Sequence, residues 1–370
     1  MARPSLEPTD RLVVKVGTAS LVGSDGRVDQ SRLTQLCSQL SELKMRGSRV
    51  ALVSSGAIAA GLGPLGIAGR PTDIPSLQAA AAVGQGHLLE SYARLFGSHG
   101  QVVAQLLLTR YDFMHRQQYL NARNTMEKLF ELGAIPIVNE NDTIAVDEIR
   151  FGDNDLLAAL VANLARAKLL LLLTDARGLH SADPRQNPDA PIIEEVERIT
   201  PELERAAGGR GSDLSTGGMA SKIAAAWVAT FSGVGVIVAD AADPEIVDKV
   251  ARGEIVGTYF HPHPTRASAR RLWIAFGQPP RGTIVVDEGA RRAVTERKSS
   301  LLPVGVVEVR GGFKSGDTVD VAAGGRVFAR GLVRYDSQEL EEARGRSTAE
   351  LAGKEVIHRD QLIVLEAGTG

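Results

Sequence analysis

The chain has 370 residues, of which 44% are hydrophobic and 23% charged, so it is not wholly disordered and is long enough for two or three domains. Its 42 Lys and Arg residues nearly balance 44 Asp and Glu residues. The net charge of −2 argues against a protein whose whole surface binds nucleic acid. The single cysteine, Cys37, cannot form an internal disulfide or a cysteine-based zinc site, so we expect a reducing, cytoplasmic compartment.

The sequence predicts no membrane segment. Residues 1–10 are polar, with no apolar run of the kind found in signal peptides behind them. The most apolar stretch, residues 156–173, contains Arg166 and Lys168, whereas a membrane span needs about 20 mostly uncharged apolar residues. We therefore expect a soluble protein.

Strand-like and helix-like patterns alternate along the first 240 residues. Short apolar runs predict buried strands at residues 11–16, 50–53, 102–108, 135–138, 169–173 and 235–238. Apolar residues at three- and four-residue spacing predict helices near residues 29–46, 76–97, 117–132, 153–166 and 218–232. This alternation predicts an α/β fold, an αβα sandwich with helices on both faces of a mostly parallel sheet.

Polar turns follow four of the expected strands, and ligands of parallel sheets bind beyond the carboxyl ends of the strands. These turns are KVGT at 15–18, SSG at 54–56, NEND at 139–142 and TD at 174–175. Lys15 stands in an otherwise apolar strand, where an unpaired buried charge would be costly. Its side chain therefore either extends to the strand end or points into a ligand site there.

The pattern changes after residue 265. Short β-like runs separated by glycine-containing turns predict a small, mainly β domain, with strands at residues 283–286, 304–309, 318–321 and 327–332. The Pro-containing segment just before them is typical of a linker. We expect a first domain at 1–265, a linker at 266–280 and a second domain at 281–370.

The segment STGGMASK at residues 215–222 precedes a helical pattern. Glycines at a helix start let backbone N–H groups approach an anion, the helix dipole favours negative charge, and Lys222 could reach the same anion. The alternative is a loop followed by a capped helix with a solvated lysine. The segment is not a P-loop, because the chain lacks the pattern G-x-x-x-x-G-K-[ST].

Acids and amides fill two short turns, NEND at 139–142 and FGDND at 151–155. They fit a metal site, a site for an amino group, or solvated caps, and Asp153 or Asn154 could simply cap the following helix. Because the first turn directly follows a buried strand, we favour a binding site.

Gly61-x-Gly63-x-x-Gly66 formally matches the dinucleotide-binding fingerprint. It begins seven residues after Ser54, contains Pro64, and has no acidic residue about 20 residues further on. We therefore predict no dinucleotide site here.

Taken together, these motifs resemble those of the glutamate 5-kinases, in the amino-acid kinase superfamily. The matching segments cover about residues 10–260 in the family's order: VKVGT at 14–18, SSGAIAAG at 54–61, NEND at 139–142, FGDND at 151–155, LTD at 173–175 and TGGMxxK at 216–222. The one departure is Ser54, where a threonine is common, and serine keeps the hydroxyl. The part after residue 281 resembles a PUA domain.

The resemblance implies an amino-acid kinase fold and ATP-dependent phosphorylation of the γ-carboxylate of L-glutamate, the first step toward proline. A carboxylate is ionised at pH 7 and needs no general base. The reaction instead needs in-line positioning and neutralisation of charge on the moving phosphoryl group. Mg²⁺ would bridge the phosphates of ATP and be held mostly by water and phosphate oxygens, and no protein metal ligand is assigned.

The resemblance also implies residue roles. Lys15 and Lys222 would be catalytic, converging on the β- and γ-phosphates. Glutamate would contact Ser55, Asp142 and Asn154, with Asp142 pairing with the substrate ammonium. ATP would be bound by Lys15, Thr174, Asp175, Thr216, Gly217, Gly218, Met219, Ala220, Ser221 and Lys222. Supporting roles would fall to Gly17, Asp153 and Asp155.

Two alternatives remain open. Another small-carboxylate kinase, such as an acetylglutamate kinase, would have no use for Asp142 as an ammonium partner, and a PUA domain would be unexpected there. An RNA-binding regulatory protein is the other, because PUA domains often bind RNA. Residues 281–370 hold 14 Lys or Arg and 14 Asp or Glu, and a neutral module lacks the usual electrostatic footprint of RNA binding. We therefore favour a regulatory or assembly role for that domain.

The resemblance further implies a homo-oligomer, a dimer or a tetramer, and feedback inhibition by proline. Proline and glutamate share an α-carboxylate and a positively charged α-amino group, so one pocket centred on Asp142 could hold either molecule.

Overall fold

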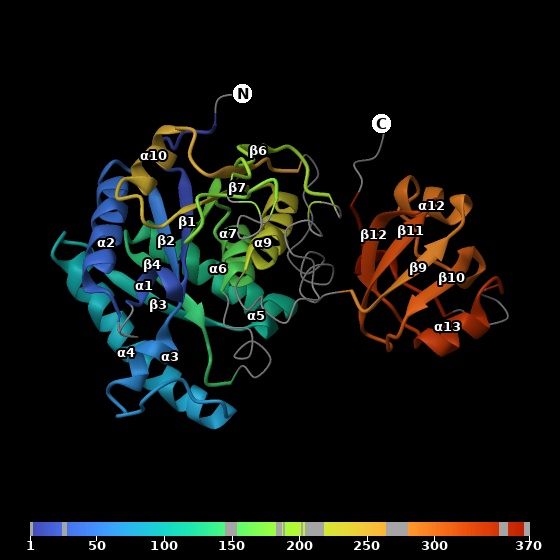
Figure 1. Ribbon diagram of the computed structural model, residues 1–370, viewed down its shortest axis with the longest axis horizontal. Coiled ribbons are helices and arrows are strands. Elements are labelled where there is room, and N and C mark those ends of the chain that lie inside the picture. The colour runs from blue at the N-terminus through green and yellow to red at the C-terminus, as the bar shows by residue number, and fades with distance from the viewer. Residues whose placement is uncertain are drawn as a thin grey trace. The chain divides into compact units, whose positions relative to one another are not determined.

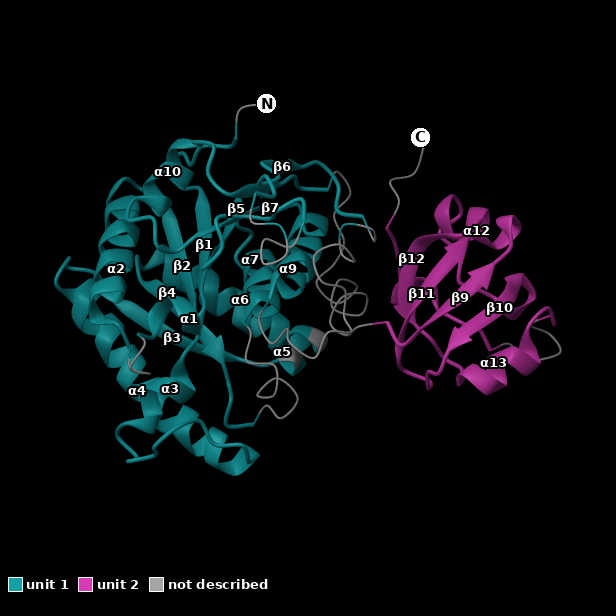
Figure 2. Ribbon diagram, viewed as in Figure 1, with its two compact units in different colours: residues 1–266 teal, residues 267–370 magenta. Residues whose placement is uncertain are grey.

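The computed structural model describes residues 3–23, 28–144, 154–182, 187, 189–200, 203, 218–263, 280–347 and 354–365. The chain divides into two compact units, residues 1–266 and 267–370 (Figure 2). Apart from residue 280, the linker expected at 266–280 lies outside the described residues.

Unit 1 is built around an eight-stranded sheet with the strand order β3-β4-β2-β1-β5-β7-β8-β6 (Figure 1). Its strands are β1 (Arg11–Val16), β2 (Arg49–Ser54), β3 (Val103–Leu108), β4 (Ile135–Glu140), β5 (Leu169–Thr174), β6 (Glu195–Val196), β7 (Gly235–Asp240) and β8 (Thr258–Phe260). All neighbouring strands are parallel except β7 and β8. The predicted mostly parallel sheet is confirmed.

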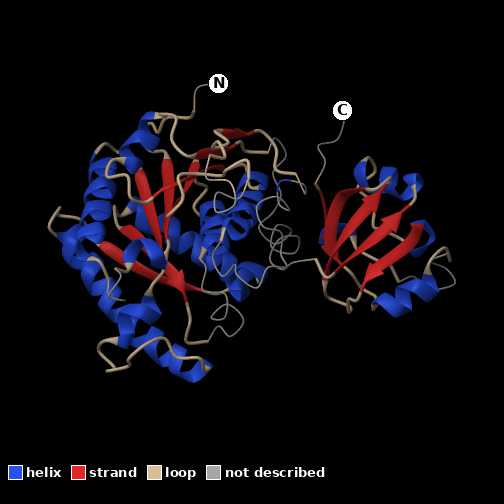
Figure 3. Cartoon of the chain, in the orientation of Figure 1, coloured by secondary structure: helices blue, strands red, loops and turns tan. Residues whose placement is uncertain are grey.

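Helices flank this sheet on both sides (Figure 3). One layer contains α2 (Gln30–Met45), α4 (Ile74–Gly97) and α10 (Ile246–Arg252), and the other contains α6 (Arg116–Glu131), α7 (Asp155–Leu164) and α9 (Met219–Phe231). The shorter helices are α1 (Thr18–Leu21), α3 (Ala57–Leu62) and α5 (Arg110–Met114). None of the helices in the described part of the chain is both long and apolar enough to cross a bilayer.

The two faces of β1 serve different purposes. Leu12, Val14 and Val16 belong to the core cluster that includes Leu33 and Leu40 of α2. Because successive side chains of a strand point to opposite faces, Lys15 faces the layer of α7 and α9. The alternation along β1 therefore places one charged side chain among the helices that carry the acidic and glycine-rich motifs.

Helices α3 and α4 approach each other closely at two glycines. A Cβ on Gly61 would lie 1.8 Å from the carbonyl oxygen of Ala80, and one on Gly84 would lie 1.8 Å from that of Ala57. Gly61 therefore serves helix packing inside α3, and the segment lacks the strand–turn–helix context of a dinucleotide site.

Unit 2 is the small, mainly β domain that the sequence predicts. Its sheet has the order β10-β9-β11-β12-β13, in which β9 and β11 are parallel and the other pairs antiparallel. The strands are β9 (Gly282–Val286), β10 (Val306–Gly311), β11 (Thr318–Ala323), β12 (Arg326–Leu332) and β13 (Leu362–Val364), and the helices are α12 (Glu288–Thr295), α13 (Ser337–Ala343) and the 3₁₀ turns η1 (Pro303–Gly305) and η3 (Arg359–Gln361). Val319, Val321 and Phe328 lie in its core with Leu340 of α13.

Candidate active site

The carboxyl ends of β1, β2, β4 and β5 meet at one edge of the sheet. Val16 is paired with Ser54 of β2 on one side and with Leu173 of β5 on the other, and Val53 of β2 is paired with Val138 of β4. After β1 the chain builds the sheet on the β2 side, and it later returns to β5 on the opposite side. Such a switch in direction is where parallel sheets bind ligands.

Asp155 joins two lysines at this edge. Its Oδ1 lies 2.5 Å from Lys15 Nζ, and its Oδ2 lies 3.1 Å from Lys222 Nζ. Asp155 is 0% exposed, Lys15 3% and Lys222 5%. Oδ2 also lies 2.9 Å from Ser221 Oγ, whose proton is shared with the carbonyl of Gly218 at 2.7 Å. Two positive charges and one negative charge are therefore held together, largely out of solvent.

Local structure explains why these three charges converge. Asp155 is the first residue of α7, where the helix dipole favours a negative charge, and Lys222 lies in the first turn of α9. Lys15 comes next to last in β1 and faces both helices. A Cβ on Gly17 would already be in van der Waals contact with the Lys15 ammonium, at 3.4 Å, so a larger side chain at this position would crowd that ammonium.

A second network joins the ends of β2 and β4 to α7. Asn154 Nδ2 donates to the carbonyl oxygen of Ser54 at 2.7 Å and to Asn139 Oδ1 at 2.6 Å, and Asn139 Oδ1 also accepts from the backbone N–H of Glu140 at 2.8 Å. Asn154 occupies the N-cap position of α7, but its side chain makes no capping hydrogen bond. The simple capping alternative for Asn154 is therefore wrong, because its amide ties the sheet to the helix.

Ser55 follows β2 in a turn that requires glycine. Gly56 has a φ of +96°, a left-handed conformation that glycine adopts at little cost, and it is the N-cap of α3. The Ser55 side chain is 4% exposed, and its Oγ has no hydrogen-bond partner among the described residues. An unsatisfied buried hydroxyl needs an explanation, and contact with a ligand is one.

The other expected site residues that the structure describes lie at the same edge of the sheet. Asp142 is half-buried in the turn after β4. At the end of β5, Thr174 Oγ1 donates to Oδ1 of the exposed Asp175 at 3.0 Å. Gly218, Met219 and Ala220 are partly exposed where α9 begins. Asp153, Thr216 and Gly217 lie outside the described residues.

Comparisons with known proteins agree with this arrangement. A model of the amino acid kinase family matches residues 10–240, and a PUA domain model matches residues 282–353. The chain belongs to the amino acid kinase family. It is 46% identical to a glutamate 5-kinase of Syntrophotalea carbinolica over 98% of this chain and 100% of that protein. It is 45% identical to a glutamate 5-kinase of Caldanaerobacter subterraneus over 97% of this chain and 98% of that protein.

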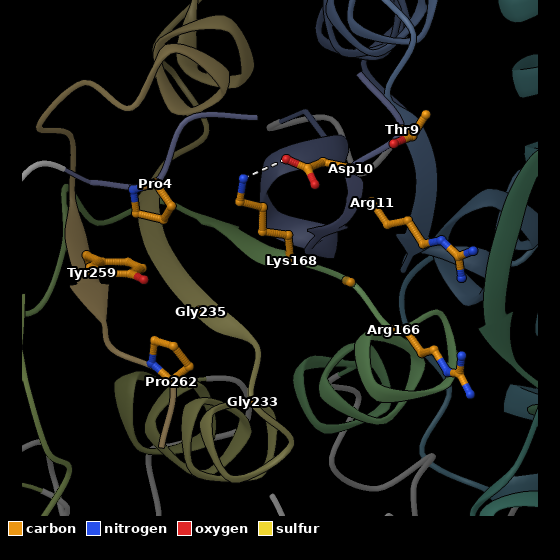
Figure 4. Close-up of a pocket in the computed structure, with 11 residues that line it drawn as sticks. Pro4, Thr9, Asp10, Arg11, Arg166, Lys168, Gly233, Gly235, Tyr259 and Pro262 are labelled. Atoms are coloured by element: carbon orange, nitrogen blue, oxygen red, sulfur yellow. Dashed lines mark hydrogen bonds and ion pairs between the residues drawn. The ribbon is translucent and has the colours of Figure 1, made fainter. Parts of the chain in front are cut away.

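A cavity of about 450 Å³ lies at the opposite, amino edge of the sheet of this amino acid kinase (Figure 4). Figure 4 shows Lys168 turned toward Asp10, and the two groups are 2.6 Å apart. Arg11, at the start of β1, pairs with Glu127 at 2.6 Å. Because Lys168 and Arg11 have acidic partners within the protein, their charges do not indicate a ligand site here. We therefore place the candidate active site at the carboxyl edge.

Three residues of the networks around this site were not assigned a role from the sequence. Asn139 belongs to the NEND turn, and Ser54 was noted only for its departure from threonine. Tyr92 follows the apolar spacing of α4 and is indistinguishable in sequence from any core residue. Its hydroxyl lies 2.8 Å from Ser54 Oγ, a contact between segments that no local pattern reveals.

Proposed function

We propose that this amino acid kinase transfers the γ-phosphoryl group of ATP to the γ-carboxylate of L-glutamate, the first step of proline biosynthesis. The observation that carries the proposal is the Lys15–Asp155–Lys222 cluster at the carboxyl edge of β1. The full-length similarity to proteins named glutamate 5-kinase supports the choice of substrate.

The strand order divides the expected residues into two half-sites on either side of β1. The residues expected to bind glutamate follow β2 and β4 or begin α7: Ser55, Asp142 and Asn154. Apart from Lys15 in β1, those expected to bind ATP and described by the structure follow β5 or lie where α9 begins: Thr174, Asp175 and residues 218–222. The lysine cluster lies between them, where a phosphoryl group would pass from one substrate to the other.

The proposed acceptor half-site holds glutamate by both of its ends. Asp142 pairs with the substrate ammonium, and Ser55 Oγ donates to a carboxylate oxygen. Both Nδ2 hydrogens of Asn154 go to Ser54 and Asn139, so Asn154 meets glutamate through Oδ1, which accepts from the ammonium. In this arrangement Ser55 Oγ gains the partner that it lacks among the described residues. An N-acylated substrate would offer Asp142 no positive charge.

In the reaction, a γ-carboxylate oxygen attacks the γ-phosphorus, and the bond to the β–γ bridging oxygen breaks as ADP leaves. The attacking carboxylate is already ionised, so the chain needs no base for it. Each lysine ammonium has three protons. Asp155 Oδ2 accepts a hydrogen bond from Lys222, and its Oδ1 forms an ion pair with Lys15, which holds both ammonium groups beside the place proposed for the phosphates. Lys15, Asp155 and Lys222 together have a net charge of +1, which stabilises the negative charge on the moving phosphoryl group.

Mg²⁺ fits this site as part of its nucleotide complex. Among the described residues, no group of three His, Cys, Asp or Glu side chains is arranged to hold a metal ion. Mg²⁺ commonly keeps several waters and binds through substrate phosphates, and there it neutralises phosphate charge. The protein's own contribution would be the orientation of those phosphates by Lys15, Lys222 and the N-terminus of α9.

The proposed activity is tested by coupled ADP release with glutamate, N-acetylglutamate, aspartate and carbamate as acceptors. We expect ADP release that depends on glutamate and is small with the other three. Turnover of N-acetylglutamate without turnover of glutamate would instead favour the acetylglutamate kinase alternative.

We expect Asp142→Asn to weaken glutamate binding and to leave ATP binding largely intact. The asparagine keeps the shape but loses a charge-assisted contact with the substrate ammonium. Such a contact is worth about 1.5–3 kcal/mol, so the KM for glutamate should rise by roughly 10- to 150-fold. Calorimetric titration of each substrate into the variant measures both affinities. Equal weakening of ATP and glutamate would instead point to a role in folding or metal binding.

Proline inhibition is part of the same proposal. If one pocket holds either molecule, Asp142→Asn should lose proline sensitivity together with glutamate affinity. A variant that loses glutamate affinity but keeps full proline inhibition would place the inhibitory site elsewhere.

We further propose that residues 1–265 form the catalytic domain and residues 281–370 a PUA domain that regulates it or assists assembly into a dimer or tetramer. Unit 2 contains equal numbers of positive and negative residues over 281–370, so we do not favour RNA binding. Filter binding with total cellular RNA tests that judgement.

A further inference from the structure

Tyr92 places a phenol hydroxyl in the apolar layer between α4 and the sheet. Its side chain is 0% exposed and belongs to the same core cluster as Leu33 and Val14. A phenylalanine would fill the same space without a polar atom to satisfy. The contact between the Tyr92 hydroxyl and Ser54 Oγ, 2.8 Å long, is therefore what the tyrosine adds.

The hydrogen-bond direction follows from the number of protons. Ser54 Oγ also donates to the carbonyl oxygen of Ser55, at 3.2 Å, and a serine hydroxyl has one proton. Tyr92 therefore donates to Ser54. Burial raises the pKa of Tyr92 far above its ordinary value, so the phenol remains a donor throughout the neutral range.

Ser54 is held from two sides. Its hydroxyl is held by Tyr92 of α4, and its carbonyl oxygen accepts from Asn154 at the start of α7, at 2.7 Å. The next residue is Ser55, whose buried Oγ has no partner among the described residues, and the left-handed Gly56 follows at once. The orientation of this turn fixes where the Ser55 hydroxyl points.

We infer that Tyr92 is a positioning residue for the acceptor substrate, acting through Ser54 on Ser55. This inference rests on the proposed function. Apart from Lys15 in β1 itself, the described residues expected to bind the nucleotide lie after β5 and at the start of α9, on the other side of β1. A loose turn after β2 should therefore affect glutamate and leave ATP unaffected.

The first test is Tyr92→Phe, which removes one oxygen atom and keeps the ring. Loss of one buried hydrogen bond should raise the KM for glutamate about five- to tenfold, with the KM for ATP unchanged and kcat within about twofold. Tyr119→Phe is the matched control. The Tyr119 hydroxyl is 3.1 Å from Asn163 Oδ1, near the end of α7 remote from Asp155, and its loss should not change the KM for glutamate.

The second test is a double-mutant cycle with Ser54. Ser54→Ala should raise the KM for glutamate as Tyr92→Phe does, and the double variant should be no worse than the worse single variant. Ser54→Thr keeps the hydroxyl and should restore a KM near that of the wild type. This pattern is not expected of a side chain that only fills the core.

Three results would overturn the inference: an unchanged KM for glutamate in Tyr92→Phe, an equal rise in both substrate KM values, or additive effects in the cycle. If Tyr92→Phe does not fold, Ser54→Ala decides: an unchanged KM for glutamate in that variant would overturn the inference, because the hydroxyl that Tyr92 holds would then have no effect on the acceptor site. Absence of glutamate-dependent ADP release in the wild-type protein would overturn the proposed function itself, and that result is visible before any variant is made.

Discussion

Lys222→Ala is expected to lower kcat by about a hundred- to a thousandfold while the KM for glutamate changes little. Removal of one preorganised donor from a developing charge costs catalysis about this much. Lys222 is 5% exposed, so water would screen its proposed electrostatic interaction with the phosphoryl group only weakly. A contact that strengthens in the transition state appears in kcat and not in ground-state affinity. Steady-state kinetics at saturating ATP and glutamate measure the effect.

Lys168→Ala is the matched control for this experiment. Lys168 also pairs with an aspartate, Asp10 at 2.6 Å, but at the amino edge of the same sheet. Its loss should leave kcat within about twofold, because the expected cost of a partly exposed ion pair is small. A folded Lys222→Ala enzyme with the kcat of the control would show that Lys222 takes no part in phosphoryl transfer.

The sequence predicted those parts of the fold that are determined by local pattern. Each of the six expected strands of unit 1 lies within two residues of its observed bounds, because apolar runs of this length are buried strands in a parallel sheet. Helix α3 was missed, because its six residues are too few to show a helical period. Strands β6, β8 and β13 have two or three residues and exist only through pairing with their neighbours.

A site residue could be predicted from the sequence where its chemical character differed from that of its neighbours in the chain. Lys15 is a charged residue in an otherwise apolar strand, which indicates a function. The glycines before Lys222 indicate a helix start that can bind an anion. The resemblance gave Asp155 a supporting role, but no local pattern showed that it contacts both lysines, because Asp155 is 140 residues from one and 67 from the other. Tyr92 does not differ in this way from its neighbours, since a tyrosine at an apolar helix position is an ordinary core residue. Side-chain contacts between distant segments require the three-dimensional fold.

Asp155→Asn is expected to damage both stability and catalysis. Asparagine keeps the shape but leaves two buried ammonium groups without their shared counter-charge. Removal of one partner from a buried ion pair costs about 3–5 kcal/mol of unfolding free energy. Both lysines also lose the group that orients them, so kcat should fall by at least about a hundredfold. Thermal unfolding and steady-state kinetics measure the two effects.

The same substitution should not weaken ATP binding, and this separates a positioning role from simple loss of structure. The cluster changes from a net charge of +1 to +2, and the phosphates of ATP then supply the missing negative charge. ATP should therefore raise the unfolding temperature of Asp155→Asn by more than it raises that of the wild type. Asp10→Asn is the control, because Asp10 pairs with Lys168 near the surface and its loss should cost at most about 1 kcal/mol. An Asp155→Asn enzyme with wild-type kcat would contradict the positioning role, since the lysines would then reach the phosphates without it.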